Sequence, residues 1–368
     1  MSPAARLPLL IFGMLALVVG VLAGLARLAV SQVALPEIAT TLVGVHGALM
    51  IPAFLGTVIS LERAVALSRR WPYLAPLCAG LSGLAVIIGL PPQLAQLLGI
   101  VAAATLSIGS LLILRQQPAL YTATLALGAV TWLIGSLVWL ISSFITFAVP
   151  WWMAFLVLTI AGERLELTRF LPTKPEVQRL FVIITGALLL GLTATFWQEN
   201  EGLRLYAATL FALSVWLLRY DIARHTVKQT GLPRFIAICL LGGYGWLATG
   251  GVLGLLGGFA SGAAGSPLRD AALHAIFLGF VFSMIFGHAP IIFPAVAKAR
   301  IPYHPVFYLP LAVLHASLLV RVTADLSEAS ALNMTLRQLA AIGNGIALAL
   351  FIMTMAISAL RGYQQHSR

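Results

Sequence analysis

The chain has 368 residues, of which 60% are hydrophobic and only 9% are charged, and its formal net charge is +11. Soluble domains carry about 25% charged residues, so these few charges cannot cover a water-exposed surface, and a soluble enzyme is excluded. The high hydrophobicity also excludes a disordered chain, and two cysteines are too few for a disulfide scaffold. The apolar runs are continuous and lack the alternation of a membrane β-barrel. The composition therefore indicates an all-α polytopic membrane protein.

Twelve apolar segments are long enough to cross a bilayer, which takes about 20 helical residues. Turn-forming sequences such as Pro91-Pro92 and Gln117-Pro118 separate them. We expect the segments to form a single transmembrane domain over residues 1–368. The predicted spans are residues 7–30, 38–66, 73–91, 93–114, 119–146, 150–168, 177–197, 202–220, 233–258, 270–296, 304–323 and 335–360.

Lys and Arg are distributed unevenly between the two sides of this topology. If the N-terminus and the even-numbered loops share one side, the other side holds only Arg27, Arg204, Arg269, Arg321 and Arg337. Cytoplasmic loops carry the excess of Lys and Arg, so both termini are predicted to be cytoplasmic, in an inner membrane of bacterial type. The basic residues are scattered over short loops, which favours anionic lipid as a partner and gives no support for nucleic acid.

One motif occurs twice with constant spacing. Ala-Phe-Leu-x-x-x-Ile-x-x-Glu-Arg stands at residues 53–63 and again at residues 154–164, and residues 287–289 of the tenth span offer a looser third copy. Because these copies fall in spans two, six and ten, they predict three four-helix units related by a pseudo-threefold axis along the membrane normal. Chance similarity between apolar helices is the alternative. The predicted repeats are residues 1–116, 117–230 and 231–368.

This organisation resembles subunit I of the haem–copper oxidases and also the NnrS-type membrane proteins, which are associated with nitric oxide metabolism, haem and copper. The resemblance rests on His46 in the second span and on His274 and His288 in the tenth. It implies a non-covalent b-type haem held by His46 and His274, with a quinol or another electron donor as partner. Predicted spans six and seven contain no histidine, so the copper-centre ligands of the oxidases are absent.

The residues around His274 support such a site. Intramembrane ionisable residues are functional candidates, and Asp270 lies four residues before His274, on the same helical face. A carboxylate in that position can orient a ligating imidazole by accepting a hydrogen bond from its second nitrogen. The alternative is that His46 bonds a neighbouring helix and that His274 and Asp270 form a boundary pair.

Two histidine–methionine pairs have i,i+4 spacing, namely His46 with Met50 and Met284 with His288. Thioether and imidazole together suit copper(I), so copper is a second candidate metal, although methionine in a membrane core usually serves packing. His315 in the eleventh span is a further metal-ligand candidate. Its alternative role is a hydrogen bond to a nearby carbonyl.

Charged residues at the cytoplasmic ends of the repeated helices form another candidate group: Glu62, Arg63, Glu163, Arg164 and His288. Adjacent helical residues diverge by about 100°, so each arginine is expected to pair with another helix rather than with its own glutamate. The group predicts either a structural belt of ion pairs or a proton or ion path.

The leading hypothesis is a haem-binding integral membrane protein that serves electron transfer, quinol chemistry or the handling of a diatomic gas such as NO or O2, and that acts as a membrane oxidoreductase. A proton-coupled transporter or channel that uses Glu62, Glu163 and His288 is the second hypothesis. An assembly or structural subunit of a respiratory complex is the third, and a homo- or hetero-oligomer is compatible with each.

Overall fold

A computed structural model describes residues 3–30, 34–168, 174–297 and 301–366. Every regular element within these ranges is a helix. Eleven helices are long and apolar enough to cross a membrane, and a shorter apolar helix covers Trp71–Ile87. In order, these helices correspond to the predicted spans, and the predicted fold class, an all-α polytopic membrane protein, is confirmed.

Most spans consist mainly of one α-helix, and the ninth ends in a short π-helix, η4 (Gly254–Gly258). The second and tenth spans each contain an internal π-helix. The second span consists of α3 (His46–Ala48), the π-helix η2 (Leu49–Leu55) and α4 (Gly56–Leu67). The tenth consists of α13 (Pro267–His274), the π-helix η6 (Ala275–Phe282) and α14 (Ser283–Ala297). The other long helices are α1 (Pro3–Arg27), α5 (Leu74–Ile87), α6 (Pro92–Gln116), α7 (Leu120–Ser142), α8 (Ile145–Thr168), α9 (Pro175–Ala194), α10 (Glu199–Tyr220), α12 (Leu232–Leu253), α15 (Tyr308–Leu326) and α16 (Ala331–His366).

Proline and glycine set several helix boundaries. Pro92, Pro175, Pro233 and Pro267 lie in the first turn of α6, α9, α12 and α13, where a missing N–H costs no intrahelical hydrogen bond. The third span ends at Ile87 rather than at the predicted residue 91. Gly89 adopts a φ of 73° there, a left-handed conformation that glycine enters without strain and that ends the helix.

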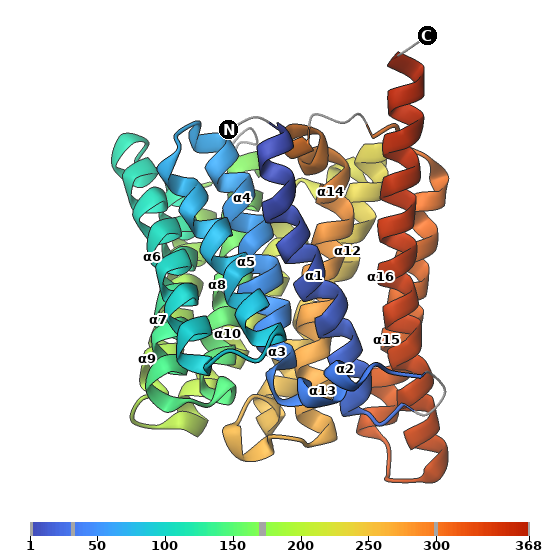
Figure 1. The fold of residues 1–368 in the computed structure, drawn as a ribbon. Coiled ribbons are helices and arrows are strands. Elements are labelled where there is room, and N and C mark those ends of the chain that lie inside the picture. The colour runs from blue at the N-terminus through green and yellow to red at the C-terminus, as the bar shows by residue number, and fades with distance from the viewer. Residues whose placement is uncertain (1–2, 31–33, 169–173, 298–300, 367–368) are drawn as a thin grey trace. The chain divides into compact units, whose positions relative to one another are not determined.

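The chain divides into two compact units. Unit 1 comprises Met1–Glu163 with Ile292–Lys298, and unit 2 comprises Arg164–Ile291 with Ala299–Arg368. In unit 1, α5 packs on α1 and α6, and α6 packs on α7; in unit 2, α10 packs on α9 and α12, and α15 lies beside α16 (Figure 1). The three predicted four-helix repeats are a separate hypothesis that stays a prediction.

Tryptophan side chains fill the core of unit 1. Trp132 of α7 is fully buried and stacks on Phe155 of α8 with ring centroids 4.9 Å apart. Gly56 allows this ring to enter, because a Cβ at that position would lie 2.6 Å from the Trp132 ring. Trp132 therefore connects α7 to both α4 and α8.

Small residues bring α9 and α10 of unit 2 together in the same way. A Cβ on Gly191 would lie 2.7 Å from the backbone nitrogen of Tyr206, and one on Gly202 would lie 2.7 Å from the Gly191 carbonyl oxygen. Such close packing drives helix association in a bilayer, where hydrophobic burial between helices contributes little.

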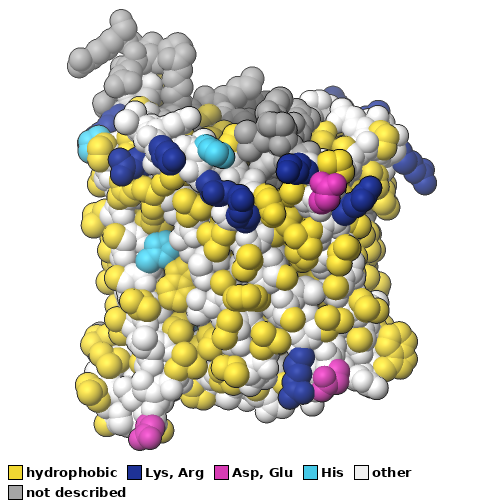
Figure 2. Space-filling view, turned by 180° about the vertical axis from the view of Figure 1, so that it is seen from behind, with side chains coloured by type: hydrophobic (Ala, Val, Ile, Leu, Met, Phe, Trp, Pro, Cys, Tyr) yellow, Lys and Arg dark blue, Asp and Glu magenta, His cyan; other side chains and the backbone are white. Residues whose placement is uncertain are grey.

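The surface has the character that lipid requires. Large hydrophobic side chains are exposed along nearly every long helix. Figure 2 shows them covering most of the face in view, with Lys and Arg gathered mainly toward one end of it. Backbone polar groups inside a bilayer must be satisfied within the helices, which explains why the described spans are helical throughout.

Candidate functional site

The start of the tenth span carries an ion-paired cluster. Ser266 caps α13, and Asp270 and His274 follow one turn apart on one face of the helix. His274 Nδ1 lies 2.8 Å from the Asp270 carbonyl oxygen and 3.4 Å from Asp270 Oδ1. Arg321 of α15 donates to Asp270 Oδ2 from Nε at 3.1 Å and from Nη2 at 2.7 Å. Each of the three side chains is less than one fifth exposed, so the cluster is held largely out of water.

His46 is held by the backbone of α1. Its Nδ1 lies 2.6 Å from the carbonyl oxygen of Gly20. Gly24 makes room for the ring, because a Cβ there would lie 2.9 Å from His46 Cε1. Since a carbonyl only accepts, the neutral ring carries its hydrogen on Nδ1 and its lone pair on Nε2. The Nδ1 contact of His274 with the Asp270 carbonyl implies the same tautomer.

Both candidate histidines lie within one helical turn of a π-helical segment. His46 begins the short helix that leads into η2, and His274 is the last α-helical residue before η6. In η2, Pro52 lacks the N–H that an α-helix would bond to the carbonyl of Ala48, and its ring would clash with that carbonyl. In η6, the indole of Trp246 fills the space where Gly279 lacks a Cβ. Wide turns of this kind occur frequently at functional sites.

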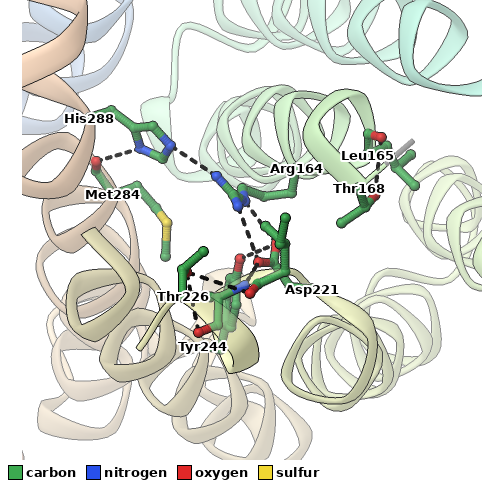
Figure 3. A network of polar contacts seen from close by, with 10 residues as sticks. Arg164, Leu165, Thr168, Asp221, Thr226, Tyr244, Met284 and His288 are labelled. Carbon is green, nitrogen blue, oxygen red and sulfur yellow. Dashed lines mark hydrogen bonds and ion pairs between the residues drawn. The ribbon is translucent and has the colours of Figure 1, made fainter. Parts of the chain in front are cut away.

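At the other end of the tenth span, His288 belongs to a second network, shown in Figure 3, where the guanidinium of Arg164 lies between the imidazole and Asp221. His288 Nδ1 lies 2.7 Å from the carbonyl oxygen of Met284, and its Nε2 lies 3.3 Å from Arg164 Nη1. Nε2 therefore accepts from the guanidinium, and its lone pair is already used in this arrangement.

Asp221 is the centre of this second network. Arg164 donates to both carboxylate oxygens, from Nε at 2.8 Å and from Nη2 at 3.1 Å. The Tyr244 hydroxyl donates to Oδ2 at 3.0 Å, and the backbone N–H of Ala223 donates to Oδ1 at 2.6 Å. The Arg164 and Asp221 side chains are 3% and 0% exposed. Four donors thus satisfy a fully buried carboxylate, which is the condition for a stable buried ion pair.

The remaining charged residues of the predicted path lie in unit 1. Arg63 of α4 donates to Glu163 Oε1 of α8 at 2.7 Å, and both side chains are about one fifth exposed. Glu62 precedes Arg63 on α4 and is half-buried. Arg63 and Arg164 each pair with a carboxylate outside their own helix, as the divergence of adjacent helical residues predicts. The Glu-Arg motif therefore connects helices.

His315 of α15 has a different hydrogen-bonding pattern from the other intramembrane histidines. Trp246 Nε1 donates to His315 Nδ1 at 2.7 Å, and the two rings are nearly parallel at 5°. Nδ1 is then the lone-pair nitrogen, and the neutral ring carries its hydrogen on Nε2, 3.5 Å from Ser283 Oγ. Both ring nitrogens are engaged within unit 2, so this arrangement presents no lone pair to a metal.

The two methionines of the copper hypothesis pack against glycines. Met50 Sδ fills the space at Gly20, where a Cβ would lie 2.8 Å from the sulfur, and Met284 Cε fills the space at Gly243 in the same way at 2.5 Å. Among the described residues, no group of three or more His, Cys, Asp or Glu side chains is arranged to hold a metal ion. A neutral imidazole that donates its Nδ1–H to a carbonyl oxygen is suited to bind iron, including haem iron, through Nε2. His46 and His274 have this arrangement.

Several partners in these networks do not stand out in the sequence. Asp221 follows α10 at the membrane boundary and has the appearance of an ordinary interfacial acid, and Tyr244 has that of a core aromatic. Arg321 gave a usable signal, because an arginine inside an apolar helix needs a partner. Asp270 is the partner that the structure supplies.

Comparison with solved structures relates this architecture to one class of membrane protein. The chain is similar to a chain of a heme-copper terminal oxidase dimer with a TM-score of 0.65 and 12% identity, covering 98% of this chain and 85% of the oxidase chain. The protein therefore has a haem–copper oxidase-like fold. By sequence, the chain belongs to the family described as "Domain of unknown function (DUF8744)", which matches residues 6–360. A search of curated proteins found no match. The resemblance to NnrS-type proteins stays a prediction.

Proposed function

We propose that the chain is a haem-binding membrane protein that serves electron transfer or the handling of a diatomic gas. One feature common to His46 and His274 carries the proposal. Each imidazole stands beside a π-helical segment and has Nδ1 within hydrogen-bonding distance of a backbone carbonyl oxygen. That contact leaves Nε2 as the basic nitrogen, the form in which histidine ligates a metal.

His274 is the better supported ligand, because its surroundings extend beyond one carbonyl. Asp270 Oδ1 lies 3.4 Å from Nδ1 and increases the donor strength of the ring, while Arg321 holds the carboxylate in place through two hydrogen bonds to Oδ2. Arg321 thereby positions Asp270, and Asp270 positions His274. When bound, haem would supply reversible one-electron exchange at iron or a coordination position for a gas.

His46 has the corresponding features in unit 1, with the Gly20 carbonyl as its acceptor and Gly24 as the space for its ring. We propose that its imidazole is also able to ligate haem iron. The haem–copper oxidase-like fold supports this assignment as a general setting for haem. His315 and the two methionines are left out of the proposed ligand set, because Trp246 donates to His315 Nδ1 and because Met50 Sδ and Met284 Cε pack against Gly20 and Gly243.

The ionic network around Asp221 favours a structural role over a proton path. A carboxylate that accepts four hydrogen bonds and has no exposed surface has little capacity to receive a proton in transit. We further propose that the basic loops face the cytoplasm of a bacterial-type inner membrane, in keeping with the usual bias of Lys and Arg.

Optical spectra of the purified full-length protein test the haem proposal. After haem supplementation, we expect a Soret band and sharp reduced α and β bands on addition of dithionite, characteristic of a six-coordinate low-spin haem. His274→Ala and His46→Ala should each abolish the low-spin signature, and added imidazole should restore it by filling the vacated ligand position. His225→Ala, which changes an exposed histidine of the short helix α11 (Ala223–Thr226), is the matched control.

A protein that stays colourless after supplementation would contradict haem binding. An unchanged spectrum in His274→Ala would move the ligand elsewhere while leaving haem binding intact. Loss of the signature without rescue by imidazole would require circular dichroism to separate ligand loss from misfolding, and a helical content equal to that of the control would assign the loss to the ligand position.

A further inference from the structure

A polar cavity of about 330 Å³ lies at the N-terminal end of α12, beside the segment that leads into α15. Its lining consists of Thr230, Gly231, Arg234, Ile238, Tyr303 and Tyr308. Every lining residue belongs to unit 2, and the cavity is separate from the His274 and Asp221 clusters by residue content. Its volume is at the lower end of the range for small-ligand sites, about 300–1,000 Å³.

The described side chains that line the cavity carry one positive charge and several hydroxyl groups. Arg234 supplies a cation, while Tyr303, Tyr308 and Thr230 supply three hydroxyl groups, and none of the lining side chains is acidic. Arg234 and Tyr303 both lie close enough to Tyr308 to act electrostatically on its phenol. Within residues 3–30, 34–168, 174–297 and 301–366, no acidic side chain forms an ion pair with Arg234. The cavity is therefore complementary to an anion.

Aromatic packing fixes the two phenols in place. The Tyr308 ring meets Phe235 edge-on at 5.2 Å, and the Tyr303 ring meets Phe307 edge-on at 5.9 Å. Phe235 and Phe307 are themselves buried and pack on each other at 5.6 Å. Donors whose rings are already held lose little conformational freedom when a ligand arrives, which is what preorganisation contributes to binding.

The apolar side of the cavity narrows the class of ligand. Ile238 lies one helical turn below Arg234 on α12, so the lining changes from charged to apolar along the helix axis. A guanidinium flanked by hydroxyl donors suits the oxygens of a phosphate group. Tyrosine is enriched at the membrane interface, the level at which lipid phosphates lie. We infer that this cavity binds a phosphate group, with an anionic lipid headgroup or a small soluble phosphate as the source.

Thermal unfolding of the purified full-length protein in detergent tests the site with defined probes. Phosphatidylglycerol, phosphatidylcholine and inorganic phosphate are titrated separately, and the midpoint shift gives an apparent affinity for each. We expect phosphatidylglycerol to raise the midpoint, and Arg234→Gln to weaken its apparent affinity at least tenfold. The control Lys228→Gln removes an exposed positive charge just before α12 without touching the cavity, and should behave as the wild type.

Further comparisons identify the source of the phosphate group and separate a loss of binding from misfolding. Protection by phosphatidylglycerol alone assigns the site to lipid, and equal protection by millimolar inorganic phosphate assigns it to a soluble phosphate. Arg234→Lys keeps the charge but loses the planar fork, so it should bind with intermediate affinity. The double variant Tyr303→Phe with Tyr308→Phe retains every charge and should weaken binding. Equal protection by phosphatidylcholine, or equal weakening in Arg234→Gln and Lys228→Gln, would overturn the assignment.

Discussion

The two histidines of the tenth span occupy opposite electrostatic settings on one continuous run of helix. His274 has a carboxylate oxygen of Asp270 3.4 Å from Nδ1, whereas His288 has the guanidinium of Arg164 3.3 Å from Nε2. Each ring places Nδ1 near the carbonyl oxygen of the residue four positions earlier. The backbone contact is thus the same for the two rings, and the charged neighbour differs: a carboxylate at His274 and a guanidinium at His288.

The aspartates of the two histidine clusters, Asp221 and Asp270, also differ in which of their oxygens accept hydrogen bonds. Asp221 receives donors on both oxygens, from Arg164, Tyr244 and the Ala223 amide. Asp270 receives both Arg321 bonds on Oδ2, and its Oδ1 faces His274. An arginine–aspartate pair can therefore serve as a closed structural tie in one place and as a support for an imidazole in another. The difference lies in the second carboxylate oxygen, Oδ1, which accepts further hydrogen bonds in Asp221 and faces His274 in Asp270.

The largest effect should come from breaking the buried ion pair between Arg164 and Asp221. Asp221→Ala leaves the Arg164 guanidinium buried without a carboxylate, and we expect a loss of about 3–5 kcal/mol in the free energy of unfolding, measured by SDS titration of the purified protein. Glu201→Ala is the control, because Arg204 and Glu201 form an exposed pair that should contribute about 0–1 kcal/mol. Similar losses in both variants would show that the Asp221 network is not the tie described above.

A smaller change should follow at the other carboxylate. Asp270→Asn keeps the side-chain volume but weakens the acceptor beside His274, so we expect haem affinity to fall about 10–100-fold, measured by Soret titration of the apoprotein. Asp221→Asn is the matched control, since Asp221 is also a buried acid paired with an arginine, Arg164, and lies outside the His274 cluster. An equal fall in both variants would mean that Asp270 acts through general stability and not through His274.

His288→Ala separates the two histidines directly. It removes one contact of Arg164, and we expect a loss of about 1.5 kcal/mol in unfolding free energy, at the low end for hydrogen bonds to charged groups because the contact is long. The low-spin haem signature should persist, in contrast to His274→Ala. His288→Gln, whose amide oxygen can accept from Arg164, should recover part of the stability. Loss of the haem spectrum in His288→Ala would reverse the comparison.

The smallest effect is expected for Tyr244→Phe. This change removes one of the four hydrogen bonds to Asp221 and leaves the others, so the unfolding free energy should fall by about 1 kcal/mol. Tyr220→Phe is the control, because the ring of Tyr220 contacts Arg219 through its face and keeps that contact without its hydroxyl. An unchanged stability in both variants would indicate that the remaining donors already satisfy Asp221.

The number and order of the spans could be predicted from sequence because apolar length is a local property. The pairing of Arg63 and Arg164 with other helices could be predicted as well, since helical geometry separates each arginine from the glutamate before it. The role of Asp221 could not, because its four donors come from α8, α12 and its own following turn. That convergence exists only in the folded chain.

A local cause can be found in the sequence for the π-helical segment η2 but not for η6. Pro52 gives a local reason for η2, because no α-helical hydrogen bond can form at its nitrogen. No proline lies within η6, where the notable feature is a tertiary contact: Trp246 of α12 packs against Gly279. Hydrophobic periodicity reports which face of a helix is buried, and it is too coarse to detect a shift of one residue in hydrogen-bond register.

The wide turns beside His46 and His274 affect how relatives of this chain should be compared. A π-type hydrogen bond spans five residues where an α-type bond spans four, so such a turn is equivalent to an insertion of one residue. A relative with a regular helix at either place would align only with a gap after the histidine. An ungapped alignment would pair every later position of that span with the wrong face of the helix, and the histidine would then be matched while its neighbours were not.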